Sequence, residues 1–210
     1  MNNKEINYKF QIDWFSQNIP LWNKTLNHLK DKPNINLLEI GSFEGKSAVW
    51  SLENIATNKT SSLTCIDTFQ GSMEDIKQKT DVSCIEETFR YNIEQVGATD
   101  RVTVLKGLSR DKLKELPDNN YDFIYIDGSH VASDVLTDAV MAIYLLKLGG
   151  IMIFDDYYWD EEPNPIHRPK KAINAFLEIF KEKITVLHKG EQVVLKRNED
   201  KGSKVRVDLV

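Results

Sequence analysis

The sequence predicts an α/β protein with a doubly wound, Rossmann-like sheet of seven strands, most of them parallel. Three observations lead to this prediction. From residue 36 onward, short apolar runs alternate with segments of helical spacing, which is the pattern of parallel βαβ units. A glycine-containing turn directly follows the first run, as at a strand-to-helix turn that binds a ligand. Two last runs, 184–188 and 192–197, flank Lys189-Gly190-Glu191 and predict a C-terminal antiparallel hairpin at one sheet edge.

The individual elements follow from periodicity and from the residues that begin or end them. The expected strands cover 36–40, 62–67, 101–106, 121–126, 151–155, 184–188 and 192–197. The expected helices cover 12–30, 46–57, 83–96, 109–116, 132–148 and 170–183. The leading helix rests on apolar residues at helical spacing, among them Phe15, Ile19 and Trp22, with Pro20 as a kink. Gly97 suits the C-terminal end of the helix at 83–96.

No internal repeat or flexible linker divides the chain before its C-terminal end. We therefore expect one catalytic or binding domain at 36–197, a helical extension at 1–35 and a tail at 198–210. The polar stretch 71–82 is expected to form a loop or short lid. The stretch 156–169, with three prolines, is expected to form a long loop.

Composition excludes several classes of protein. The net charge of −5 and the pI of about 5.5 argue against nucleic acid as the main partner. No apolar run approaches the roughly 20 residues that span a bilayer, so we expect no membrane partner. Two cysteines, Cys65 and Cys84, form neither a disulfide framework nor a zinc site, and Cys65 is expected to be buried. These features favour a cytoplasmic protein and leave a homo-oligomer open.

The segment Leu37–Ser47 is the most informative in the chain, and three kinds of ligand loop compete for it. The dinucleotide fingerprint G-x-G-x-x-G is absent, because positions 43 and 46 are Phe and Lys. The phosphate loop G-x-x-x-x-G-K-S matches only at its end, since its first glycine would be Ile40. The third form is an acid, one residue, Gly, three residues and Gly, and it is present as Glu39, Gly41 and Gly45. Gly41 allows a sharp turn, and Gly45 would let a ligand approach the backbone.

The residues that follow each strand are the candidates for binding, because ligands of such sheets lie beyond the carboxyl ends of the strands. Asp67, after the second strand, can accept both hydroxyls of a ribose, and Phe69 can pack on a base. Alternatively, Asp67 caps a turn and Phe69 belongs to the core. Ser109 after the third strand can cap the following helix.

Three acids follow the fourth and fifth strands. Asp127 stands before Gly128-Ser129-His130, and Asp155 and Asp156 end the fifth strand. Carboxylates brought together repel one another, and a divalent cation with oxygen ligands, such as Mg²⁺, relieves that repulsion. His130 could act as a general base. The alternatives are that Asp127 caps a helix, that the other two acids are solvated, and that His130 is structural.

The pattern Glu39, Gly41, Gly45 resembles the cofactor loop of class I S-adenosylmethionine-dependent methyltransferases. With Asp127-Gly-Ser-His130 and Gly149-Gly150…Asp155-Asp156 added, the chain resembles the metal-assisted O-methyltransferases that modify small molecules and macrolide sugars. The resemblance runs from about residue 37 to 197. In the catechol-type branch the position matching Asp156 is usually Asn. The residues that the resemblance implies for the cofactor are Glu39, Gly41, Ser42, Phe43, Gly45, Ser47, Asp67, Thr68, Phe69, Gly107, Leu108, Ser109 and Asp127.

The resemblance implies a Rossmann-like fold, S-adenosyl-L-methionine as cofactor and a small-molecule acceptor with a hydroxyl. Asp127, Asp155 and Asp156 would hold a divalent cation, Mg²⁺ first among the candidates, and Asp127 and His130 would be catalytic. One rival is a P-loop nucleotide hydrolase or kinase, suggested by Gly45-Lys46-Ser47. The other is a non-catalytic, cofactor-binding protein of the same fold.

Overall fold

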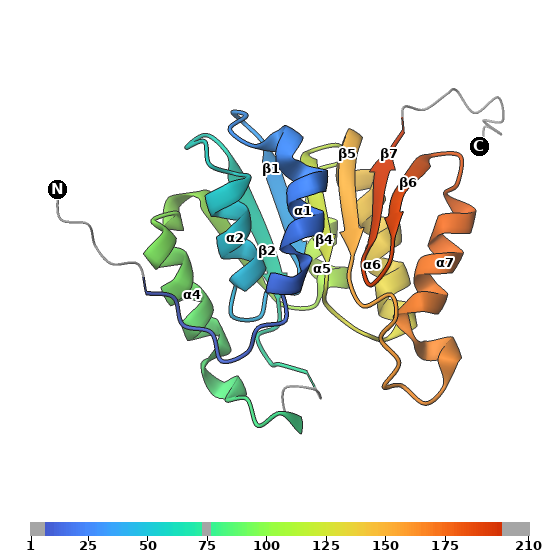
Figure 1. Cartoon of the computed structure of the whole chain (residues 1–210), viewed down its shortest axis with the longest axis horizontal. Coiled ribbons are helices and arrows are strands. Elements are labelled where there is room, and N and C mark those ends of the chain that lie inside the picture. Colours follow the sequence, from blue (N-terminus) through green and yellow to red (C-terminus); the bar gives the residue numbers. More distant parts are fainter. Residues whose placement is uncertain (1–6, 73–76, 199–210) are drawn as a thin grey trace.

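The computed structural model describes residues 7–72 and 77–198, and within them seven strands form one sheet in the order β3-β2-β1-β4-β5-β7-β6 (Figure 1). The strands are β1 Asn36–Ile40, β2 Ser62–Asp67, β3 Val102–Lys106, β4 Tyr121–Ile126, β5 Leu146–Phe154, β6 Ile184–Lys189 and β7 Val193–Arg197. β1 to β5 are parallel to one another, whereas β7 pairs antiparallel with both β5 and β6. The prediction of a mostly parallel, seven-stranded sheet with a C-terminal hairpin is confirmed.

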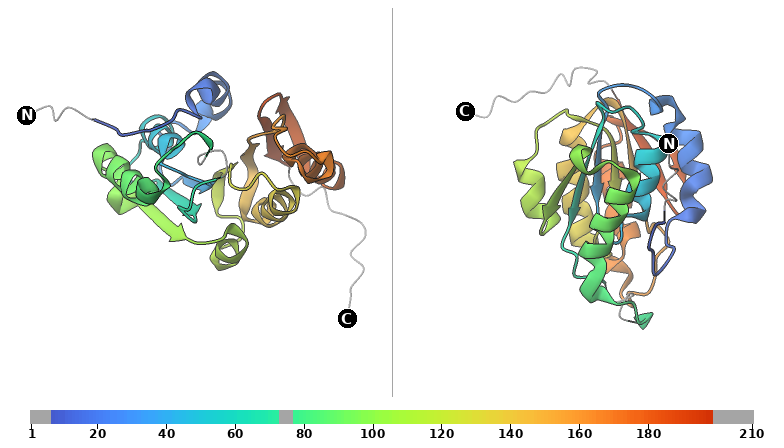
Figure 2. Two further views of the ribbon diagram at one scale, coloured as in Figure 1. Left: turned by 90° about the horizontal axis from the view of Figure 1, so that it is seen from below. Right: turned by 90° about the vertical axis from the view of Figure 1, so that its left-hand side faces the viewer.

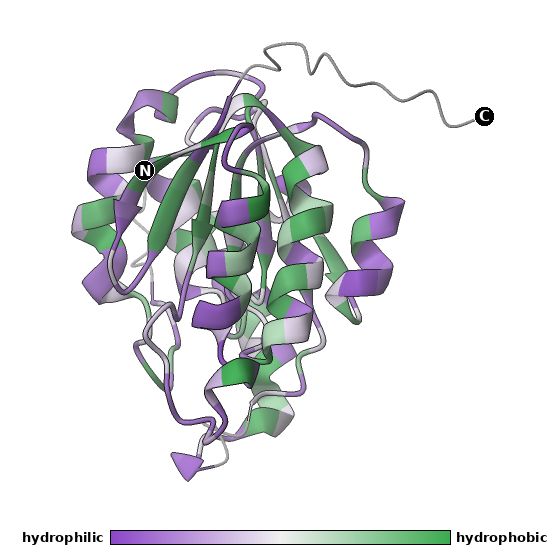
Figure 3. Ribbon diagram, turned by 90° about the vertical axis from the view of Figure 1, so that its right-hand side faces the viewer, coloured by the Kyte–Doolittle hydropathy of each residue, from purple (hydrophilic) through white to green (hydrophobic). Residues whose placement is uncertain are grey.

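Helices cover both faces of the sheet (Figure 2). They are α1 Ile19–Leu26, α2 Lys46–Asn54, α4 Ile85–Val96, α5 Ser109–Lys112, α6 Ala132–Leu145 and α7 Pro169–Ile179. One core joins a sheet face to α1, α2 and α4, and fully buried Trp22 lies within it. The other core joins the opposite face to α6 and α7, with Phe176 fully buried. Apolar strands occupy the middle, and the helices carry polar residues on their outer sides (Figure 3).

The register of the parallel strands aligns their carboxyl ends. Ile40 pairs with both Ile66 and Ile126, and Ile126 pairs with Phe154. The residues that follow β1, β2, β4 and β5 therefore share one edge, as the sequence predicted.

Several expected elements have different ends, and two of these differences have a clear physical cause. The leading helix was expected over 12–30 with a kink at Pro20. It is shorter, because α1 begins at Ile19 and is flanked by the 3₁₀ turns Ser16–Asn18 and Asn27–Leu29, and Pro20 lies in the first turn of α1. Proline is tolerated there because that N–H has no partner within the helix. The helix expected to reach residue 148 ends at Leu145, because buried Leu146 already pairs with Tyr121 as the start of β5. The carbonyls of residues 144 and 145 accept instead from Asn119 and Asn120.

The remaining differences are small. A 3₁₀ turn, Val82–Cys84, precedes α4. Of the lid expected at 71–82, residues 73–76 lie outside the described residues. Cys65 is buried, as expected. No helix in the described part of the chain is long and apolar enough to cross a membrane.

Candidate functional site

The two glycines of the first loop are required by close packing. Gly41 has a φ of 84°, and a Cβ there would lie 1.9 Å from the carbonyl oxygen of Asp127. Gly45 has a φ of 83° and precedes α2, and its Cβ would lie 2.8 Å from the Phe89 ring of α4. Gly45 was expected to leave room for a ligand, but the Phe89 ring occupies that space. The loop is thus set tightly between the turn after β4 and helix α4.

Beneath the loop lies a buried acid of strand β1. Glu39 is buried, accepts a short hydrogen bond from the Ser47 hydroxyl and contacts the Cys65 thiol. Burial raises the pKa of Glu39 from 4.5 to about 7, against the lowering effect of the Ser47 hydrogen bond. Ser47 reaches the cavity described below, whereas Glu39 and Gly45 do not border it. Glu39 therefore ties the start of α2 to β1.

Asp67 lies at the end of β2 and holds the glycine loop from the side. Its Oδ2 accepts the backbone N–H groups of Ser42 and Phe43 at 2.6 and 2.8 Å, and its Oδ1 accepts that of Phe69 at 2.6 Å. Phe69 is buried and its ring packs on Phe89 with centroids 5.4 Å apart. Phe69 thus lies in the core, which was the alternative expectation, while Asp67 borders the cavity.

The N-terminal segment 7–17 crosses the glycine loop, a feature that sequence reasoning missed. Glu44 is buried and accepts both the backbone and the side-chain N–H groups of Gln11 at 2.7 Å. Asn92 of α4 is fully buried and exchanges two hydrogen bonds with the backbone of Lys9. Asp13 forms an ion pair with Lys46 at 2.5 Å. Only the unusual Glu44 inside the loop could have signalled such a partner.

A cavity of about 1070 Å³ lies along the edge where the parallel strands end. The predicted residues that border it are Gly41, Ser42, Phe43, Ser47, Asp67, Thr68, Gly107, Leu108, Ser109, Asp127, His130, Asp155 and Asp156. Segment 7–17 adds aromatic side chains to the same wall, among them Phe10 and Trp14. The structure therefore brings most of the predicted site residues into one cavity.

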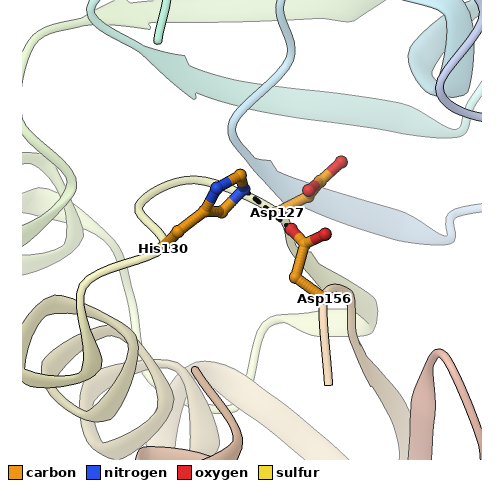
Figure 4. Close-up of side chains that lie close together, drawn as sticks. All are labelled: Asp127, His130 and Asp156. Atoms are coloured by element: carbon orange, nitrogen blue, oxygen red, sulfur yellow. Dashed lines mark ion pairs between the residues drawn. The ribbon is translucent and has the colours of Figure 1, made fainter. Parts of the chain in front are cut away.

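Asp127, His130 and Asp156 come together at one end of this cavity (Figure 4). One ligand atom from each lies within 4.8 Å of the others, which is close enough to share a metal ion. Nε2 of His130 lies 2.9 Å from Oδ2 of Asp156, and the Trp159 ring packs on the imidazole with centroids 4.7 Å apart. Asp156 has a φ of 58°, so the turn after β5 holds it in a strained, left-handed conformation.

Asp155 lies behind this group in a partly buried hydrogen-bond network. Its Oδ2 accepts from the Tyr125 hydroxyl, from Gln192 at 2.9 Å and from Asn18 at 3.3 Å. The same Tyr125 hydroxyl lies 2.9 Å from Oδ2 of Asp127. Oδ1 of Asp155 accepts the N–H of Asp156. Tyr125, Asn18 and Gln192 were not predicted, because elements far apart in the sequence bring them together.

Electrostatics at this end disfavour ionised carboxylates. Burial raises the pKa of Asp127 well above its ordinary value, and the charges of Asp155 and Asp156 raise it further. Burial likewise raises the pKa of Asp155, and the charge of Asp156 adds to the effect. A bound cation would offset this repulsion, so the donor set fits an ion that prefers oxygen ligands.

Comparison with known families identifies the fold. The sequence profile of a methyltransferase-domain family matches residues 38–157, more than half of the chain. The chain belongs to this family. The matched residues contain the glycine loop, Asp67 and the three acids, and the sheet is that of the class I methyltransferases.

The chain also resembles individual proteins. The uncharacterized protein R132 of Acanthamoeba polyphaga mimivirus is 30% identical over 134 residues, which cover 60% of this chain and 53% of that protein. The chain thus spans about half the length of this curated relative.

Two solved structures show the shared fold. TomG of Streptomyces achromogenes, an O-methyltransferase in complex with S-adenosylmethionine, has a TM-score of 0.59 at 16% identity, over 78% of this chain and 73% of that one. The mycinamycin-pathway methyltransferase MycE, in complex with Mg, S-adenosylhomocysteine and mycinamycin VI, has a TM-score of 0.62 at 12% identity. That match covers 93% of this chain and 53% of MycE.

Proposed function

We propose that this protein transfers the methyl group of S-adenosyl-L-methionine to a hydroxyl oxygen of a small molecule, with the help of a divalent cation. The observation that carries the proposal is the convergence of Asp127, His130 and Asp156 at one end of a cavity whose other walls are the glycine loop and Asp67. The cofactor would supply the methyl group on a positively charged sulfur.

The cofactor half of the cavity offers fixed backbone and carboxylate groups. The Asp67 carboxylate borders the cavity and already holds the loop amides of Ser42 and Phe43, so its position is set before a ligand arrives. Backbone N–H groups of Ser42, Phe43 and Phe69 already occupy three of the carboxylate's roughly four lone-pair sites, so the remaining one, on Oδ1, can accept a ribose hydroxyl. Such preorganisation lowers the ordering cost of binding.

The acceptor half would be organised by the three acids. Asp127 and Asp156 would hold the cation, and Asp155 can add its Oδ1, which accepts the neighbouring backbone amide and has further lone pairs. Bound there, the cation would attract an acceptor hydroxyl and lower its pKa. Asp156 orients the imidazole of His130, which would take the hydroxyl proton as the oxygen attacks the methyl carbon. MycE, whose structure contains Mg and mycinamycin VI, supports an acceptor of this kind.

Transfer of labelled methyl groups to a panel of phenols and sugars tests the reaction. We expect turnover with Mg²⁺ and none in EDTA, while S-adenosylhomocysteine still binds, since Asp67 and the loop, and not the cation, would hold the cofactor. His130→Ala should lower kcat by about 10²- to 10⁴-fold. Full turnover in EDTA would show a metal-independent methyltransferase.

A calorimetric titration with Mn²⁺ isolates the metal site from the reaction. Asp156→Asn should lose most Mn²⁺ affinity and keep its affinity for S-adenosylhomocysteine. Asp160→Asn, an exposed acid four residues further on, is the matched control and should bind Mn²⁺ like the unaltered protein. A protein that binds S-adenosylhomocysteine but neither Mn²⁺ nor an acceptor would support the non-catalytic alternative. The nucleotide-hydrolase alternative is not favoured, because the chain belongs to a methyltransferase family and because Lys46 forms an ion pair with Asp13.

A further inference from the structure

The connection between β6 and β7 ends in a buried glutamine, Gln192, which lies beside the acid cluster. Gln192 is 1% exposed and directly precedes β7. Its Oε1 accepts the indole N–H of Trp22 at 2.8 Å, and its Nε2 donates to Oδ2 of Asp155 at 2.9 Å. Because an indole N–H can only donate, Trp22 requires the oxygen of the amide on its own side. The N–H groups of the amide are therefore turned towards Asp155.

Two further donors meet on the same oxygen of Asp155. Asn18 lies four residues before Trp22, so both side chains lie on one side of the first helical segment. Nδ2 of Asn18 donates to Oδ2 of Asp155 at 3.3 Å, and the Tyr125 hydroxyl of β4 donates to it as well. Since Oδ2 is engaged by these donors, Oδ1 is the oxygen that can face a ligand, and it accepts the backbone N–H of Asp156 at 2.9 Å.

Through these contacts Asp155 is joined to both acids that are proposed to hold the cation. The Tyr125 hydroxyl lies 2.9 Å from Oδ2 of Asp127, and the backbone N–H of Asp156 is held by Asp155 itself. Partners that hydrogen-bond to metal ligands fix the orientation of those ligands, and their loss lowers metal affinity. Gln192 does not border the cavity, so it can influence the cation only through Asp155.

We propose that Gln192, oriented by Trp22, is a positioning residue of the metal site. It holds Asp155 in place, and Asp155 in turn keeps Asp127 and Asp156 at the spacing that a divalent cation requires. The proposal rests on the proposed function, because it takes the acid cluster to be a metal site. The cofactor half of the cavity has no part in this network, so loss of Gln192 should weaken cation binding and leave cofactor binding intact.

Calorimetric titration with Mn²⁺ and with S-adenosylhomocysteine tests the proposal without the need for an acceptor. Gln192→Met keeps the length of the side chain and removes both hydrogen bonds. It should bind Mn²⁺ more weakly by about 10- to 100-fold and keep its affinity for S-adenosylhomocysteine. Trp22→Phe removes the N–H and keeps an aromatic ring, so its Mn²⁺ affinity should fall by about 2- to 10-fold, the worth of one neutral hydrogen bond. The double variant should match Gln192→Met alone, because Trp22 acts through Gln192.

Trp50→Phe is the matched control for a change in packing. The Trp50 ring packs on that of Trp22 with centroids 5.5 Å apart, in the same core. Within the described part of the chain, no hydrogen bond joins the Trp50 ring to Gln192 or Asp155. Trp50→Phe should therefore bind Mn²⁺ like the unaltered protein. Equal losses of Mn²⁺ affinity in Trp50→Phe and Trp22→Phe would show an effect of packing and overturn the role of the indole N–H.

The other outcomes separate this inference from the proposed function. A Gln192→Met protein that binds both Mn²⁺ and S-adenosylhomocysteine like the unaltered protein would overturn the inference, while a loss of Mn²⁺ in Asp156→Asn would still uphold the metal site. If Gln192→Met binds neither ligand and has lost its fold, the comparison of Trp22→Phe with Trp50→Phe decides. An unaltered protein that binds S-adenosylhomocysteine but no Mn²⁺ would refute the inference together with the metal part of the proposed function.

Discussion

The buried acid Glu39 contributes to the pH dependence of the stability of the ligand-free protein, and Glu39→Gln should remove that contribution. Burial raises the pKa of Glu39 from 4.5 to about 7. A carboxyl group whose pKa is higher in the folded than in the unfolded state stabilises the fold at low pH. That stabilisation is lost as pH rises from 4.5 through 7, because the unfolded state releases its proton first.

The magnitude follows from the two pKa values. Each pH unit between them corresponds to about 1.4 kcal/mol, so the full penalty for ionising Glu39 in place is about 3 kcal/mol. Between pH 5 and pH 8, roughly 2.5 kcal/mol of this should appear, since a little is already lost at pH 5. The amide side chain introduced by Glu39→Gln would keep an acceptor for the Ser47 hydroxyl without titrating.

Urea unfolding of both proteins at several pH values from 5 to 8 measures the effect. The unfolding free energy of the unaltered protein, minus that of Glu39→Gln, should fall by about 2–3 kcal/mol over this range. Glu94→Gln, an exposed acid on α4, controls for the change in net charge. Ser47→Ala removes the hydrogen bond that favours the ionised form, so it should move the transition to higher pH. Parallel curves for the unaltered protein and Glu39→Gln would refute the reasoning.

Two further predictions concern the loop above Glu39. Gly45→Ala should destabilise the fold by about 1–3 kcal/mol in urea unfolding, through its positive φ and its collision with the Phe89 ring; an additional Phe89→Leu change should recover part of the loss, and a full loss in both would point to φ alone. Asp67→Ala should weaken S-adenosylhomocysteine by about 1.5–3 kcal/mol in calorimetry. Unchanged affinity in a folded Asp67→Ala protein would rule out the ribose role.

The sequence predicted the sheet, and it predicted that Asp67, Asp127 and Asp155 share one edge, because both predictions depend on local signals. Apolar runs and the turn at Gly41 mark strand β1 and its loop, and parallel register then forces Asp67, Asp127 and Asp155 to one edge without knowledge of any tertiary contact. The ends of elements were less accurate where tertiary contacts decide them. Leu146 leaves its helix because β4 offers it a strand partner.

Features that join distant segments had no comparable signal. The hydrogen bonds between Gln11 and Glu44 and between Lys9 and Asn92 link residues 33 and 83 positions apart. Phe69 points into the core because its ring packs on Phe89. Position 45 requires glycine because a Cβ there would collide with the same Phe89 ring. Side-chain packing against α4 therefore settles what the loop sequence alone left open.

The groups proposed to bind the cofactor and the acid cluster differ in the same way, because the first depend on local contacts and the second on distant ones. The groups proposed to bind the cofactor lie within the glycine loop and at the end of the adjacent strand β2. The acid cluster instead depends on both ends of the chain, since Trp22 of α1 donates to Gln192 at 2.8 Å, and Gln192 donates to Asp155. Because Tyr125 joins Asp155 to Asp127, a change at Trp22 or Gln192 should perturb the carboxylates proposed to bind the metal before it perturbs Asp67. The first helix and the last strand are therefore part of the proposed acceptor half of the site, although neither lies within the segment that matches the methyltransferase family.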